Sequence, residues 1–147
     1  MKAVVQRVKE TRLSVNGEII SEIKHGLIVY FGVMKGDVKT SADYLAKKIA
    51  NMRIFEDENG KMNLSVKDVD GEILSVSQFT LLADTSHGNR PSFIEAETPA
   101  IANETYEYFC ERLACEGVKS VKKGVFGEDM KIEQYNDGPV TIVMEKI

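Results

Sequence analysis

The chain has 147 residues, of which 43% are hydrophobic, and its formal net charge is −4. This length and apolar fraction fit one folded domain over residues 1–147 and exclude a disordered tail, while the acidic balance argues against broad, non-specific binding to nucleic acid. No apolar run approaches the roughly 20 residues that a membrane helix needs, and the first residues lack a signal-peptide cleavage pattern, so we expect a cytoplasmic protein with no membrane partner.

The first part of the sequence predicts β-structure. Residues 3–8, 12–15 and 18–23 are strand-like, and Asn16-Gly17 is a strong two-residue hairpin turn before the third of these strands. Residues 27–31 form a continuous apolar run, which is typical of a central strand buried on both faces.

A first helix is expected from Thr40, a suitable N-cap residue. Its apolar side chains follow helical spacing on one face, at Ala42, Leu45, Ala46, Ile49 and Met52. A short strand over residues 53–55 is expected to end in a turn at residues 57–60, and residues 73–79 predict another strand.

A second helix is expected to begin near Thr98, with Pro99 in the favoured first position and Gly117 as its C-terminal stop. Helical spacing relates its apolar residues, Ala102, Tyr106, Phe109, Cys110 and Leu113. The rest of the sequence predicts three strands, at residues 120–123, 130–135 and 140–145.

Two helices and eight or nine strands predict an α/β fold. Two packed β-sheets or a partly closed barrel would form the core, with the two helices covering one face. Cys110 and Cys115 are five residues apart on the second helix, so their side chains diverge by about 140°. We therefore expect no disulfide and no zinc site, and interpret both thiols as inert packing residues.

Polar residues that suggest chemistry first occur in Ser77-Gln78-Phe79-Thr80. Strand alternation would place Gln78 and Thr80 on one face, where an amide and a hydroxyl can orient a carbonyl or a water, or stabilise an oxyanion. Neither group is a base at neutral pH. The alternative interpretation is a polar strand end that satisfies its own backbone.

A conventional catalytic triad is hard to assemble from this sequence. The histidines are His25 and His87 only. Asp84, Ser86 and His87 are close in sequence, but the members of a triad converge in space, and neighbours on one loop seldom do. No His-x-x-x-His and no paired cysteine motif is present, so we expect no metal and no cofactor.

Two loops complete the set of candidates. Arg90 has a planar fork suited to a phosphate or carboxylate, and is otherwise an ordinary surface arginine. Asn136-Asp137-Gly138-Pro139 is expected to form a tight turn before a final strand, and its Gly-Pro bond could be cis.

At these residues the sequence resembles the D-aminoacyl-tRNA deacylase family. Ser77-Gln78-Phe79-Thr80 and Asn136-Asp137-Gly138-Pro139-Val140-Thr141 look like its two signature motifs. The resemblance covers the whole chain and includes Gln6-Arg7-Val8, Arg53-Ile54-Phe55, Gly60-Lys61-Met62-Asn63, Gly88-Asn89-Arg90-Pro91-Ser92-Phe93 and Gly124-Val125-Phe126-Gly127-Glu128-Asp129-Met130. Glu128 departs from the small residue that is usual there, and we expect it to face solvent.

The resemblance implies a homodimeric ester hydrolase that releases D-amino acids, and in some cases glycine, from the 3′ end of tRNA. Its active site would lie at the subunit interface. Gly138 and a cis Pro139 would reach from one subunit into the pocket of the other as a chirality filter that excludes L side chains. Arg7 would hold that backbone, and Met130 would line the pocket.

The resemblance also implies that Ser77, Gln78, Phe79 and Thr80 surround the reacting ester, with Phe79 helping to bind the terminal adenosine. Either Thr80 is a nucleophile, or the 2′-hydroxyl of that adenosine activates the reaction while the protein positions the ester. The missing base favours the second interpretation, because an unactivated hydroxyl is a poor nucleophile.

Two other functions remain as alternatives. A small-ester hydrolase using Thr80 would lack both a base and the Gly-x-Ser-x-Gly nucleophile elbow. A non-catalytic RNA-binding module would have an unusual acidic charge and no aromatic RNA-binding motif.

Overall fold

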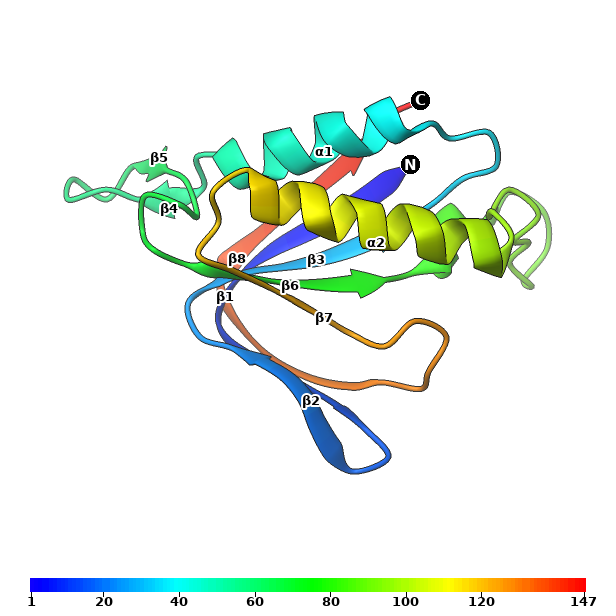
Figure 1. Cartoon of the computed structure of the whole chain (residues 1–147), viewed down its shortest axis with the longest axis horizontal. Helices are drawn as coiled ribbons and strands as arrows, with labels where there is room; N and C mark the ends of the chain where they lie inside the picture. Colours follow the sequence, from blue (N-terminus) through cyan, green and yellow to red (C-terminus); the bar gives the residue numbers. More distant parts are fainter.

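The computed structural model describes residues 1–147 and shows two helices side by side on one face of a strongly curved sheet (Figure 1). The elements in chain order are β1 (Lys2–Val15), β2 (Glu18–Ile23), β3 (Gly26–Gly32), α1 (Lys39–Asn51), β4 (Phe55–Glu56), β5 (Met62–Leu64), β6 (Glu72–Ser77), the 3-10 turn η1 (Phe79–Leu82), α2 (Pro99–Cys115), β7 (Ser120–Lys123) and β8 (Lys131–Glu145). The expected α/β class, with two helices covering one face of a barrel-like core, is confirmed. Neither α1 nor α2 combines the length and the hydrophobicity of a membrane-spanning helix.

The large sheet nearly closes on itself. Its order is β2-β1-β3-β6-β7, β8 also pairs with β1, and β4 and β5 form a separate two-stranded sheet. The first half of β1 pairs with β3 and its second half with β2, while β8 follows β1 along both halves. The ammonium of Lys122 on β7 donates to the carbonyl of Glu22 on β2, 2.6 Å away. This contact links the two end strands and gives the sheet its barrel-like form.

Strand β3 separates two hydrophobic cores. Leu27, Val29 and Phe31 belong to the larger core between the sheet and the helices. Ile28 belongs to the smaller core inside the curl of the sheet. The ring of Phe31 stacks on that of Phe109 of α2, with the centroids 4.0 Å apart. The prediction of a central strand buried on both faces is therefore confirmed.

The hairpin and the start of α2 also follow the sequence. Asn16 and Gly17 both have positive φ angles, 51° and 81°, as a type I′ turn between β1 and β2 requires. Thr98 is the N-cap of α2 and Pro99 its first residue. The start of α1 differs, because the N-cap is Val38, which makes no side-chain cap, and not Thr40. The apolar face of α1, with Ala42, Leu45, Ala46 and Ile49, packs into the larger core and positions this helix without a cap.

The C-terminal strand differs most from expectation. Residues 131–145 form one strand, where two strands and a turn were expected. Val8 of β1 pairs with Asn136 and Gln6 pairs with Thr141, so residues 137–140 lie opposite Arg7 alone. The Asn-Asp-Gly-Pro segment is thus a wide bulge in an otherwise continuous strand. Proline has no N–H for the ladder, which confines it to such bulges and to edges.

Candidate active site

The Ser-Gln-Phe-Thr motif lies where β6 ends. The strand stops at Ser77 and not at Phe79, and η1 follows directly. The N–H of Gln78 still donates to the carbonyl of Phe31, at 2.8 Å. Gly32, at the end of β3, lets η1 come this close, because a Cβ there would lie 2.9 Å from the Gln78 carbonyl oxygen and 2.5 Å from a methyl group of Leu82. The glycine is therefore part of the architecture of the site.

Gln78 and Thr80 meet as expected, but for a different reason. The side-chain amide of Gln78 donates to the hydroxyl oxygen of Thr80, at 2.6 Å. The turn of η1, and not strand alternation, brings the two together. An amide is not a base in either orientation, so this partner cannot remove the Thr80 proton. The pair can supply hydrogen-bond donors to a developing oxyanion.

A groove of about 730 Å³ opens beside this motif. Its lining includes Ser77, Gln78, Phe79 and Met130 of the predicted site residues, while Thr80 is exposed and does not line it. Glu128 is also exposed and lies at the rim, as expected from the sequence. The wall of the groove is largely apolar.

Two aromatic residues of the groove were not among the predicted site residues. Phe93 contacts Phe79 edge to face, with the ring centroids 5.1 Å apart. Phe126 lines the groove close to Met130 in sequence. Phe79 is 56% exposed, so its ring is available to a ligand. Both missed residues lie in loops, where no periodicity indicates which side chains will meet.

Arg7 holds the bulge of β8. It is buried, with 6% of its surface exposed. Its Nε donates to the carbonyl of Asp137 at 3.0 Å, and its Nη1 donates to the carbonyl of Ile54 at 2.7 Å. The carboxylate of Asp137 lies 3.4 Å from the same Nε and 4.0 Å from Nε2 of His25. The backbone just before Gly138 is therefore tied to the body of the protein.

Gly138 and Pro139 lie outside the groove. Both are exposed, the peptide bond between them is cis, and neither residue lines the groove. Arg7, opposite the bulge, is in register with Leu27 of β3 and through it with Ile73 of β6. Since Ile73 precedes Ser77 by four residues, the bulge on β8 lies roughly 13 Å back along the strand direction and three strands away from β6. One chain does not bring the two predicted motifs together.

The loop between η1 and α2 contains no catalytic triad. The Ser86 hydroxyl contacts Nδ1 of His87 at 2.8 Å, but the Asp84 carboxylate accepts from the N–H of Ser86 instead of supporting the imidazole. Hydrogen bonding by Ser86 lowers the pKa of Asp84. Arg90 is exposed and forms no ion pair in this structure. These polar residues satisfy one another at the surface.

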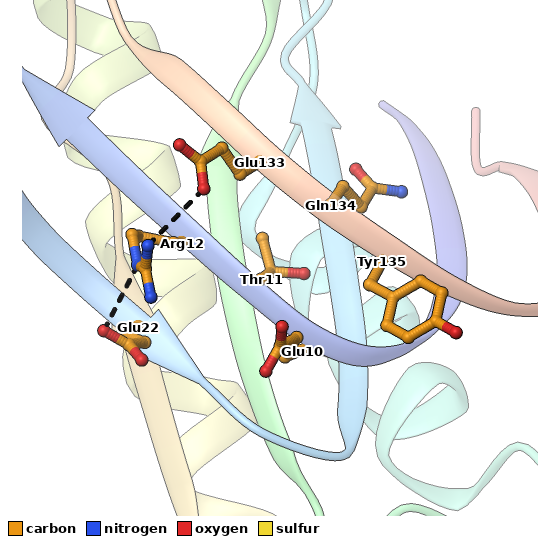
Figure 2. Close-up of a pocket in the computed structure, with 7 residues that line it drawn as sticks. All are labelled: Glu10, Thr11, Arg12, Glu22, Glu133, Gln134 and Tyr135. Carbon is orange, nitrogen blue, oxygen red and sulfur yellow. Dashed lines mark ion pairs between the residues drawn. The ribbon is translucent and has the colours of Figure 1, made fainter.

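A smaller hollow of about 220 Å³ lies on the outer surface of β1, β2 and β8. Figure 2 shows Arg12 between Glu22 and Glu133 in this hollow. The guanidinium lies 3.6 Å from one carboxylate and 3.5 Å from the other. Three carboxylates, of Glu10, Glu22 and Glu133, line the hollow with one guanidinium, and none of the predicted site residues does.

The interior beneath β6 is neutral. Tyr106 donates to the carbonyl of Ser75 at 2.8 Å, and burial raises the pKa of its phenol. Burial also raises the pKa of Cys110 to about 11, which agrees with an inert packing thiol. Cys115 is exposed, so its interpretation as a packing residue was wrong. It lies on the solvent-facing side of the last turn of α2.

Comparisons with known proteins agree with this geometry. The family described as "D-Tyr-tRNA(Tyr) deacylase" matches residues 4–145. A solved structure titled "c-Myc DNA Unwinding Element Binding Protein" is 42% identical with a TM-score of 0.95, covering 100% of this chain and 99% of that one. Another, titled "Structural Analysis of a probable eukaryotic D-amino acid tRNA deacylase", is 15% identical with a TM-score of 0.83 and 97% coverage of both chains, and it shares the fold.

Proposed function

The chain belongs to the D-Tyr-tRNA(Tyr) deacylase family, and from that premise we propose that its active site is completed by a second copy of the chain. Its activity is that of the family, hydrolysis of the ester between a D-amino acid and tRNA, so aminoacyl-tRNA is its substrate. The role we assign to this activity is proofreading in the cytoplasm, with D-amino acids removed before they enter protein synthesis.

The observation that carries the proposal is the separation of the two motifs. Gly138 and Pro139 do not line the groove beside Gln78, and the bulge that carries them is exposed. A two-fold axis would offer the bulge of each copy to the groove of the other. A homodimer then contains two complete sites.

In that arrangement Gly138 and Pro139 act through their backbone. Their carbonyl groups would occupy the space that an L side chain needs, while a D side chain would point away from them. Discrimination of this kind works by excluding the wrong substrate and needs a rigid obstacle. The two hydrogen bonds that Arg7 donates, to Asp137 and Ile54, supply the rigidity.

The chemistry at the ester relies on positioning. Water, assisted by the 2′-hydroxyl of the terminal adenosine, attacks the ester carbonyl, and the bond to the ribose 3′-oxygen then breaks. The oxygen of the carbonyl becomes negative in the transition state, and the Gln78 amide and Thr80 hydroxyl can donate to it. An aminoacyl ester is already reactive, so orientation and oxyanion stabilisation suffice.

The direct test mixes the purified protein with tRNA charged with D- or L-tyrosine and follows the release of free tyrosine. We expect rapid release from the D ester and almost none from the L ester. Equal slow release from both would refute the chirality filter. Release from small esters but not from tRNA would favour the small-ester hydrolase, and tRNA binding without any release would favour the RNA-binding module.

A further inference from the structure

A second large groove lies between α1 and the outer edge of β8, away from the site described above. Its volume is about 600 Å³. Ile142 and Met144 of β8 form its apolar floor, and Tyr44, Lys47 and Lys48 of α1 form its rim. Figure 1 shows α1 lying over this part of β8. We call it the Lys-Tyr groove.

The Lys-Tyr groove has an unneutralised positive charge. The ammonium of Lys48 lies 5.7 Å from the centre of the Tyr44 ring, and that of Lys146 lies 5.1 Å from it. Neither these two lysines nor Lys47 forms an ion pair, whereas Lys39, on the same helix, pairs with Glu104. Two cations thus share one aromatic ring with no anion between them.

The nearest acidic side chains in sequence do not compensate this charge. Asp43 is occupied, because its carboxylate lies 3.0 Å from Nε of Arg112 and accepts from the Tyr108 hydroxyl at 2.8 Å. Glu145 follows Met144 on β8, and successive strand residues point to opposite faces, so it faces away from the groove. A local excess of positive charge on a chain of net charge −4 indicates a surface for an anionic partner.

The floor of the groove, at Met144, is level with the active-site end of the sheet. Lys2 pairs with Glu145 on β8 and with Gly32 on β3, and Phe31 pairs with Ser77 on β6. The end of β8, just before Lys146, is therefore level with the end of β6.

We propose that the Lys-Tyr groove binds the phosphate backbone of the tRNA acceptor arm while the 3′ end occupies the active site. Ammonium groups pair with phosphates as compact charges, and the exposed face of Tyr44 can pack against a ribose or base. A protein with a net charge of −4 needs a local patch of positive charge to bind RNA. The inference rests on the aminoacyl-tRNA activity of the chain.

The first test compares two double variants that remove the same charge. Lys48→Ala with Lys146→Ala removes the two cations at Tyr44. Lys61→Ala with Lys67→Ala is the matched control, because these lysines also form no ion pair and lie in the hairpin and loop around β5. Binding of uncharged tRNA is measured at several salt concentrations, and thermal unfolding of each variant verifies that it is folded.

We expect the groove variant to bind tRNA about tenfold more weakly at low salt, and the slope of log Kd against log salt to fall by about 1 for each lysine removed. The control should bind as the wild type does. Equal losses in the two double variants, or no loss in the groove variant, would overturn the proposal.

The second test separates the groove from the reaction itself. KM and kcat are measured for D-tyrosyl-tRNA and for the D-tyrosyl ester of adenosine, which has no acceptor arm. The groove variant should raise KM for the tRNA substrate alone, and an equal loss with both esters would contradict phosphate binding. If the wild type hydrolysed neither ester, the active-site proposal would fail, while tRNA binding would still decide the role of the groove.

Discussion

The hydroxyl of Thr80 accepts a hydrogen bond from Gln78. A nucleophilic hydroxyl would instead need a base that accepts its proton. The hydroxyl oxygen of Thr80 lies 2.6 Å from the amide nitrogen of Gln78, and no histidine or carboxylate is bonded to it. We therefore expect the nucleophile to come from elsewhere, with these side chains serving as hydrogen-bond donors. This residue-scale detail separates two mechanisms that share the same product.

We expect Thr80→Ala to retain deacylase activity within about tenfold, and Gln78→Ala to lose about a hundredfold, the usual effect of removing an oxyanion donor. Single-turnover rates with D-tyrosyl-tRNA measure both, and circular dichroism controls for folding. Near-complete loss in a folded Thr80→Ala variant would restore the nucleophile mechanism.

Removal of Arg7 should show that a buried arginine contributes more to stability than an exposed one. Arg7→Ala leaves the carbonyls of Asp137 and Ile54 without their donor, so we expect the free energy of unfolding to fall by about 3 kcal/mol. Arg12→Ala is the control, since its side chain is 47% exposed and its ion pairs are long; it should cost under about 1 kcal/mol. Urea unfolding measures both changes.

Arg7→Ala should also narrow the ratio of D to L hydrolysis, because the bulge before Gly138 loses its tie to β1. Arg12→Ala should leave this ratio unchanged. A destabilised Arg7→Ala variant with full discrimination would show that the bulge is held by other contacts.

At the scale of elements, η1 depends on the end of β3. Gly32→Ala would place a methyl group against the backbone of Gln78, so η1 must shift away. We expect kcat to fall at least about tenfold and stability to fall by about 1–3 kcal/mol. Gly60→Ala is the control: its φ of 74° also strains alanine, but no atom lies within 4 Å of the added carbon. It should lower stability without changing kcat.

The elements themselves were largely predictable, with the errors at their ends. The Asn16-Gly17 hairpin and the Thr98-Pro99 helix start follow from the backbone preferences of one or two residues. The extra length of β8 does not, because a bulge and a turn have the same local sequence. Only pairing with β1 on both sides of the bulge distinguishes the two.

For the whole molecule, the shared site predicts a dimer. Light scattering should give a mass of about 33 kDa, twice the 16.4 kDa of the chain. Because the filter would come from the partner, dilution into the monomer range should narrow the ratio of D to L hydrolysis. A stable monomer that still discriminates the two esters would contradict cross-subunit exclusion.

Most of the fold class and of the polar motifs can be predicted from sequence, because alternation, turn chemistry and short motifs act over a few neighbouring residues. The position of these residues relative to one another cannot be predicted from sequence. Strand register determines that Gln78 lies at the groove while Gly138 lies roughly 13 Å back along the sheet. Curvature of the sheet and packing of the loops bring Phe93 onto Phe79 and Arg7 onto Asp137. These contacts join segments distant in the chain, and no local pattern encodes them.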